Sequence, residues 1–192
     1  MKPVARVLML SLSLSLSCSA ALPALAQDAK VTAPLAEAVV RASAADVATP
    51  DAVIAALYDV ISGPAGKARD WNRLRALFAP QGKMVSVGNR ADGATPAAFL
   101  SVDDYIARVT KPFSEAGFYE TELARTAEVF GPIMHVFSTY ESRHAPGDAK
   151  PFQRGINSIQ LQFDGQRWWI VSLMWRAETD KLALPEKYLP KR

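Results

Sequence analysis

The segment that decides the fold is residues 156–176, which reads INSIQLQFDGQRWWIVSLMWR. Two runs rich in aromatic and β-branched side chains flank Asp164-Gly165, a pair typical of tight turns between antiparallel strands. Gly131-Pro132 separates a second pair of such runs in the same way. These patterns predict a four-stranded antiparallel sheet in the C-terminal half of the chain. The predicted strands are residues 118–130, 133–143, 152–163 and 167–176.

The strand register decides which side chains of the second hairpin meet the core. A two-residue turn at Asp164-Gly165 places Asn157 opposite Ser172, on the face that we expect to meet the helices. A buried amide needs a hydrogen-bond partner, so Asn157 either pairs with Ser172 or orients a ligand. The opposite face carries Trp169, Leu173 and Trp175. A face this aromatic would pack on a second subunit or on the C-terminal tail.

The first hairpin carries a polar face. A Gly131-Pro132 turn predicts three cross-strand pairs, which are His135 with Glu128, Arg143 with Glu120, and Glu141 with Glu122. The simplest interpretation is a solvated face held by charge pairs, each worth less than about 1 kcal/mol. A more specific hypothesis is that His135 transfers protons and that Glu128 orients its ring. Both interpretations remain open at this point.

Three helices precede the strands. Their predicted N-terminal caps are Thr49, Asp70 and Ser101, and their ends are set by Gly63, Pro80 and Pro112. Apolar residues recur at helical spacing within each segment. A short strand, residues 84–87, follows the second helix, and residues 89–96 are expected to form a loop. Helices followed by an antiparallel sheet specify an α+β fold.

The N-terminus has the pattern of a secretory signal peptide. Lys2 and Arg6 precede an apolar run of about 10 residues, and Ala24-Leu25-Ala26 supplies a cleavage site after Ala26. The run is shorter than the roughly 20 apolar residues of a membrane span. We therefore expect a periplasmic or secreted protein without a stable membrane anchor. The alternative is a lipoprotein modified at Cys18, but Ser15 stands where an aliphatic residue is needed.

The expected organisation has four parts, which are a signal peptide (1–26), a flexible lead-in (27–48), an α+β domain (49–180) and a tail (181–192). Removal of the signal removes Cys18, the one cysteine, and with it thiolate and cysteine–zinc chemistry. The net charge is only +3 without dense basic runs, so no nucleic acid partner is expected. His135 and His144 do not form a compact ligand set, so no metal or cofactor is expected either.

Several motifs carry a family resemblance. They are Asp70-Trp71, residues 77–80 (LFAP), residues 135–141 (HVFSTYE) and residues 164–171 (DGQRWWIV). With these motifs and the order of elements, residues 49–175 resemble the nuclear transport factor 2-like, or SnoaL-like, superfamily, and especially its exported bacterial members. The resemblance implies a cystatin-like α+β cone, in which a bent sheet is closed by three N-terminal helices around a deep apolar pocket. It also implies frequent dimerisation through the sheet.

The resemblance does not indicate one particular activity. The superfamily includes isomerases, dehydratases, epoxide hydrolases and cyclases, besides proteins that only bind or assemble. Its enzymes commonly place a carboxylate just before the Asp-Trp pair or shortly after the second helix. Residues 66–69 (GKAR) and Gln81-Gly82 occupy those places here, and neither supplies a general base. Whether the chain is an enzyme is left open.

Three functions follow from these patterns. The first is binding of a small hydrophobic or aromatic molecule in the cone. The second is a cofactor-free lyase or isomerase that uses acid–base catalysis there. The third is a dimeric structural or interaction module that uses the aromatic sheet face. The candidate catalytic residues are His135 and Tyr58, and the candidate ligand contacts are Trp71, Tyr105, Arg125, Asn157 and Trp168.

Overall fold

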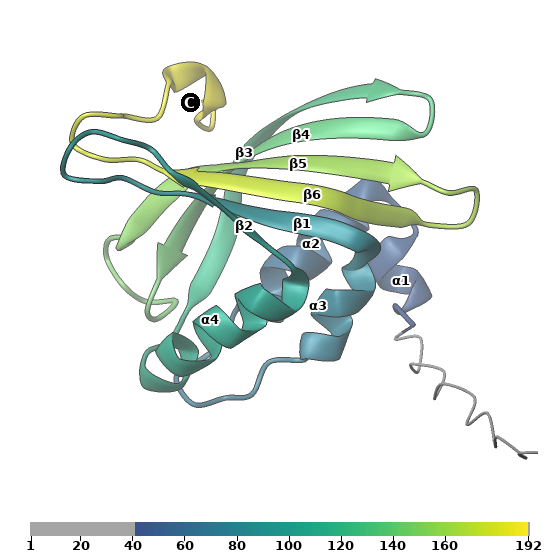
Figure 1. Ribbon diagram of the computed structural model, residues 1–192, viewed down its shortest axis with the longest axis horizontal. Coiled ribbons are helices and arrows are strands. Elements are labelled where there is room, and N and C mark those ends of the chain that lie inside the picture. Colours follow the sequence, from purple (N-terminus) through teal and green to yellow (C-terminus); the bar gives the residue numbers. More distant parts are fainter. Residues whose placement is uncertain (1–40, 192) are drawn as a thin grey trace, which may run out of the picture. The chain divides into compact units, whose positions relative to one another are not determined.

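A computed structural model describes residues 41–191. The predicted signal peptide and the lead-in as far as residue 40 lie outside the described residues. Six strands form one sheet in the order β2-β1-β6-β5-β4-β3, and the helices lie against one of its faces (Figure 1). The sheet is curved and not closed into a barrel, as the α+β prediction requires. None of the helices within 41–191 is long and apolar enough to cross a membrane.

The α-helices precede β3, and the four long antiparallel strands follow one another in the C-terminal part of the chain. The helices are α1 (Ala44–Val47), α2 (Pro50–Ile61), α3 (Trp71–Leu77), α4 (Val102–Glu115) and the 3-10 helix η1 (Glu186–Tyr188). The strands are β1 (Phe78–Val87), β2 (Ala97–Leu100), β3 (Tyr119–Phe130), β4 (Ile133–Arg143), β5 (Gln153–Phe163) and β6 (Trp168–Ala177). The four predicted C-terminal strands are confirmed to within one residue, and they are antiparallel neighbours. Strand β2, which was not predicted, pairs with β1 at the sheet edge.

The predicted helix caps are present. The side chains of Thr49, Asp70 and Ser101 each accept a hydrogen bond from a backbone N–H in the first turn. The predicted end at Pro112 is wrong, because α4 continues to Glu115. A proline in the last turn removes only one backbone hydrogen bond. Phe113 is buried against Phe118, with ring centroids 4.7 Å apart, and this contact holds the final turn.

The second helix also ends earlier than predicted. Helix α3 stops at Leu77, and Pro80 lies within β1, which begins six residues before the predicted strand. The packed domain also reaches back into the predicted lead-in. Val47 of α1 is buried, and Arg73 binds Asp46 through its Nε atom at 2.8 Å.

A bulge in β3 changes the predicted register of the first hairpin. Glu128 pairs with His135 as predicted, but the ladder skips Leu123. Beyond it, Glu120 pairs with Ser142 instead of Arg143, and Glu122 pairs with Tyr140 instead of Glu141. A shift of one residue moves every following side chain to the other face of the sheet. Glu120 and Glu122 therefore face the helices and not the solvent.

The second hairpin has a similar irregularity. The turn spans Asp164 to Arg167, and the Asp164 N–H donates to the Arg167 carbonyl at 3.1 Å. The turn is therefore two residues longer than predicted. The ladder then skips Val171, so Asn157 lies opposite Trp175 and not Ser172. Leu173 is buried, and Trp175 packs against the core. The prediction that Leu173 and Trp175 lie on an outer aromatic face is therefore wrong.

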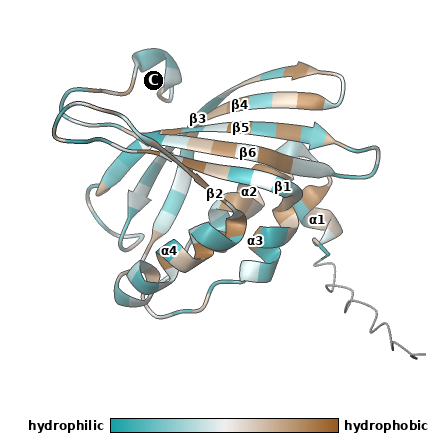
Figure 2. Ribbon diagram, in the orientation of Figure 1, coloured by the Kyte–Doolittle hydropathy of each residue, from teal (hydrophilic) through white to brown (hydrophobic). Residues whose placement is uncertain are grey.

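The two faces of the sheet are covered differently. The helices cover the concave face, whose buried apolar residues include Met134, Val136 and Ile159. Hydrophobic and hydrophilic positions alternate along β4, β5 and β6 (Figure 2), as expected for strands with unlike faces. The tail crosses the convex face, where the Thr139 hydroxyl donates to the Tyr188 carbonyl at 2.6 Å.

Gly155 tests how closely the concave face is packed. It lies opposite Tyr140, and a Cβ atom at this position would lie 2.8 Å from the Tyr140 Cζ atom. We predict that Gly155→Ala lowers the free energy of unfolding by about 2–3 kcal/mol through overpacking, as measured by urea denaturation. Gly147→Ala is the control, because a Cβ there meets nothing within 4 Å. Equal losses in the two variants would contradict this account.

Candidate functional site

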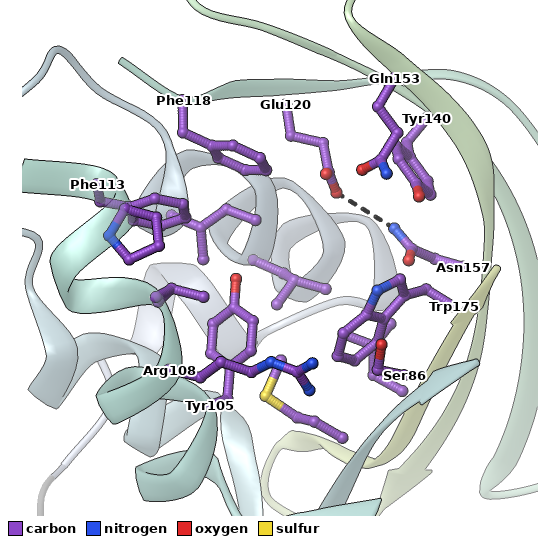
Figure 3. Close-up of a pocket in the computed structure, with 16 residues that line it drawn as sticks. Ser86, Tyr105, Arg108, Phe113, Phe118, Glu120, Tyr140, Gln153, Asn157 and Trp175 are labelled. Atoms are coloured by element: carbon purple, nitrogen blue, oxygen red, sulfur yellow. Dashed lines mark hydrogen bonds between the residues drawn. The ribbon is translucent and has the colours of Figure 1, made fainter. Parts of the chain in front are cut away.

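A cavity of about 350 Å³ lies between the helices and the concave face of the sheet. Its walls are mostly aliphatic and aromatic, with a small set of polar side chains pointing inward (Figure 3). The polar residues of the lining are Ser86, Tyr105, Arg108, Glu120, Tyr140, Gln153 and Asn157, and Trp175 adds the largest aromatic surface. Few polar groups in an apolar concavity are the usual composition of a small-molecule site.

Glu120 is the acidic group of this cavity. The bulge at Leu123 turns it inward, and its Oε2 atom accepts a hydrogen bond from the Ser142 hydroxyl at 2.9 Å. Burial raises the pKa of Glu120 to about 7, although the hydrogen bonds from Ser142 and Asn157 act in the opposite direction. A carboxyl group with a pKa near neutrality can both accept and donate a proton at physiological pH.

Asn157 links Glu120 to a buried network. Its Nδ2 atom donates to the Tyr58 hydroxyl at 3.0 Å and toward Glu120 Oε1 at 3.4 Å. The Tyr58 hydroxyl lies 2.7 Å from Ser138 Oγ, which in turn donates to Glu122 Oε1 at 2.5 Å. Since Ser138 uses its proton on Glu122, the Tyr58 proton goes to Ser138. Tyr58 therefore supports Asn157 from behind the cavity wall.

Two tyrosine hydroxyls face Glu120 within the cavity. Burial, followed by the charge of Glu120, raises the pKa of Tyr105 and of Tyr140. Both groups therefore keep their protons at physiological pH. The Tyr140 hydroxyl is the one buried side-chain polar atom in residues 41–191 without a hydrogen-bond partner. Such a group is costly unless something else satisfies it, and Tyr140 is one of the residues that line the cavity.

Arg108 provides a positive charge at the cavity. It lies on α4, is exposed, and extends across the cavity toward Trp175 (Figure 3). Within the described part of the chain it forms no ion pair with a carboxylate. The guanidinium is therefore available to a bound molecule.

The structure brings some of the candidate residues together. Tyr105 and Asn157 line the cavity, and Tyr58 is one hydrogen bond behind it. Trp71 and Trp168 are partly buried against the core outside the lining. Trp71 stacks on Phe113 with ring centroids 6.3 Å apart. The ring centroids of Trp168 and Phe163 are 5.5 Å apart. Both positions are those of packing residues.

His135 and Arg125 lie away from the cavity lining. His135 is on the convex face, where its Nε2 atom lies 3.2 Å from Ser158 Oγ. Arg125 binds Glu122 through its Nε atom at 2.9 Å and Asp51 at 2.7 Å. His135 therefore does not share the cavity with Asn157 and Tyr105.

Sequence reasoning missed Glu120, Tyr140, Arg108 and Trp175 as lining residues. On β4, every second side chain points toward the helices, as the apolar residues Met134 and Val136 show. Tyr140 belongs to the same series of inward-facing positions. For Glu120 the sequence offered no comparable signal. The bulged residue is a leucine and not the glycine that often marks a bulge.

A metal centre is not formed by the described residues. Within 41–191, no group of three or more His, Cys, Asp and Glu side chains is placed to hold a metal ion. The cavity itself presents carboxyl, hydroxyl, amide and guanidinium groups.

Comparison with known proteins identifies the fold. The structure resembles the β subunit of a protein assigned as an aromatic-ring-hydroxylating dioxygenase from Novosphingobium aromaticivorans. The TM-score is 0.52 at 12% identity, over 73% of this chain and 94% of that chain. It also resembles a nuclear transport factor 2-like protein of unknown function from Silicibacter pomeroyi, with 18% identity, 68% and 94% coverage and a TM-score of 0.47. The chain has a nuclear transport factor 2-like fold.

A third structure with this fold is a protein assigned as a dehydratase from Streptomyces avermitilis. It is 14% identical over 68% of this chain and 94% of that chain, with a TM-score of 0.48. No model of a protein family matches the sequence, and no curated protein matches it. At these identities the comparisons concern the fold alone, so the function has to be argued from the cavity.

The raised pKa of Glu120 leads to a stability prediction. The folded protein retains the Glu120 proton up to about pH 7, whereas the ordinary pKa of a glutamate carboxyl is 4.5. Unfolding therefore releases this proton between those values, so rising pH destabilises the native protein there. We predict that Glu120→Gln gains stability relative to the native chain over this range, by up to about 3 kcal/mol, and that the difference is constant above it.

The measurement is urea denaturation at closely spaced pH values. Glu128→Gln is the matched control, because Glu128 is an exposed carboxyl on the same strand. A stability difference that does not change with pH for Glu120→Gln would show that Glu120 titrates as an ordinary carboxyl.

Proposed function

We propose that this protein binds a small, largely apolar molecule in the cavity between α4 and the sheet. The observation that carries the proposal is the unsatisfied hydroxyl of Tyr140, which is buried near Glu120 in the wall of a mostly apolar cavity. A bound molecule with a hydrogen-bond acceptor would satisfy this hydroxyl. Its apolar part would lie against Leu57, Leu173 and Trp175.

The size and walls of the cavity support this proposal. Its volume of about 350 Å³ is near the lower end of the range for small-molecule sites, which is about 300–1,000 Å³. Phe113, Phe118 and Trp175 supply flat aromatic surface. We therefore propose a ligand with one ring or two fused rings, because flat rings stack well on aromatic walls.

Val109 offers a direct test, because it lines the cavity from α4. We predict that the neutral fluorescent probe N-phenyl-1-naphthylamine binds the native domain with micromolar affinity, and that Val109→Trp weakens binding at least tenfold by filling the cavity. The measurement is a fluorescence titration. Ala107→Trp is the control, since Ala107 is exposed on the same helix. Equal binding by the two variants, both folded by circular dichroism, would reject the cavity as the site.

A second candidate function is cofactor-free acid–base catalysis, and the pKa of Glu120 favours it. The ionised Glu120 carboxylate would take a proton from the carbon next to a ligand carbonyl, and the electron pair of that C–H bond would pass to the carbonyl oxygen. The protonated hydroxyls of Tyr105 and Tyr140 would donate to the resulting oxyanion. Return of the proton to a carbon completes an isomerisation or a simple exchange.

Exchange of α-protons in D₂O measures this step without knowledge of the natural substrate. We predict that the domain accelerates deuterium incorporation into 2-tetralone, a fused bicyclic ketone, as followed by proton NMR. Glu120→Gln should lower the accelerated rate by at least about 100-fold, the usual contribution of a general base. Glu128→Gln should leave the rate unchanged. Acceleration that survives in Glu120→Gln would exclude Glu120 as the base.

The expected homodimer and the expected export remain proposals. Because Leu173 and Trp175 point toward the helices, a second copy would have to use other residues of the convex face. Val171 and Met174 of β6 are exposed there. We propose this part of the convex face as the dimer surface.

A further inference from the structure

We propose that the ligand is an anionic amphiphile, with a flat apolar body, a carboxylate-like group bound by Arg108, and a polar atom at its other end that meets Tyr140. This inference rests on the proposed binding function and adds the charge and orientation of the ligand. It follows from where the positive charge, the neutral donors and the carboxyl group lie around the cavity.

Arg108 differs from most arginines of the domain. Arg73, Arg125 and Arg154 each bind a carboxylate, and Arg69 donates to four backbone carbonyls. Arg108 has no such partner within residues 41–191, although it borders an apolar cavity. A guanidinium presents two parallel donors that fit a carboxylate, and partial removal from water strengthens that pairing.

The remaining polar groups fit one orientation of such a ligand. Glu120 and Arg108 do not form an ion pair, and Figure 3 shows them on different sides of the cavity. An anion held at Arg108 therefore avoids the acidic side. Tyr140 is buried whereas Arg108 is exposed, so the unsatisfied hydroxyl lies at the inner end and the charge at the outer end. The apolar surface of Trp175 and Val109 belongs to the same cavity.

The test compares two competitors of nearly the same shape, one anionic and one neutral. They are 6-hydroxy-2-naphthoate and 6-hydroxy-2-acetonaphthone, in which a methyl group replaces one carboxylate oxygen. Each displaces N-phenyl-1-naphthylamine from the native domain at pH 6, where the naphthoate is ionised and most Glu120 is protonated. We predict that the naphthoate binds about five- to tenfold more tightly than the ketone.

Three variants assign this preference to residues. Arg108→Gln should remove it by weakening the naphthoate alone, because the neutral ketone makes no ion pair. Lys111→Gln removes a charge from the same helix, where Lys111 pairs with Glu115 outside the cavity lining, and should preserve the preference. Tyr140→Phe should weaken both competitors by a similar factor of about three to ten, since each loses the same hydrogen bond.

The outcomes separate this inference from the proposed function. If both competitors displace the probe equally and Arg108→Gln changes neither, the anionic ligand is rejected while binding in the cavity stands. If Lys111→Gln removes the preference as strongly as Arg108→Gln, general charge attraction replaces the specific ion pair, and the inference is overturned. If neither the probe nor the competitors bind, both proposals fall.

Discussion

The site depends on one geometric constraint, which is that a bulge of one residue exchanges the two faces of a strand. The bulge at Leu123 turns Glu120 toward the helices, and the bulge at Val171 does the same for Leu173 and Trp175. A regular ladder through both hairpins would leave a carboxylate and an indole outside the sheet. The same irregularities increase the local bend of the strands, so the curvature that creates the cavity and the residues that line it have a common origin.

The inward carboxyl has an energetic consequence for the whole domain. Burial disfavours the charged form of Glu120, and the hydrogen bonds from Ser142 and Asn157 only partly compensate. Asn157 in turn is fixed by Tyr58, whose proton is committed to Ser138. A chain of satisfied donors thus holds a poorly solvated acid in one orientation. Retaining such a group at a cost in stability is typical of a functional position.

The sequence predicted the elements well and their pairing only in part. Strand composition and cap residues such as Thr49 and Ser101 act locally, so the pattern of the chain reveals them. The bulge at Leu123 depends on packing between strands, and no turn residue or glycine marks it. Tyr58 and Asn157 are 99 positions apart, and their contact requires the complete fold. Of the predicted site residues, Tyr105 and Asn157 line the cavity, and the prediction lacked the acid that the bulge brings in.

The direction of the hydrogen bonds reduces the number of groups that can act on a ligand. Asn157 donates its amide protons to Tyr58 and Glu120, and Tyr58 donates its hydroxyl proton to Ser138. Neither side chain therefore has a proton to donate to a molecule in the cavity. The groups that remain are the hydroxyls of Tyr105 and Tyr140, the carboxyl of Glu120 and the side chains of Ser86 and Gln153, with Arg108 at the outer side. Two neutral donors opposite one base suit a carbonyl or hydroxyl compound, whereas a single outer cation suits an acid. A flat molecule that carries both groups would use the two tyrosine hydroxyls, the Glu120 carboxyl and the Arg108 guanidinium together.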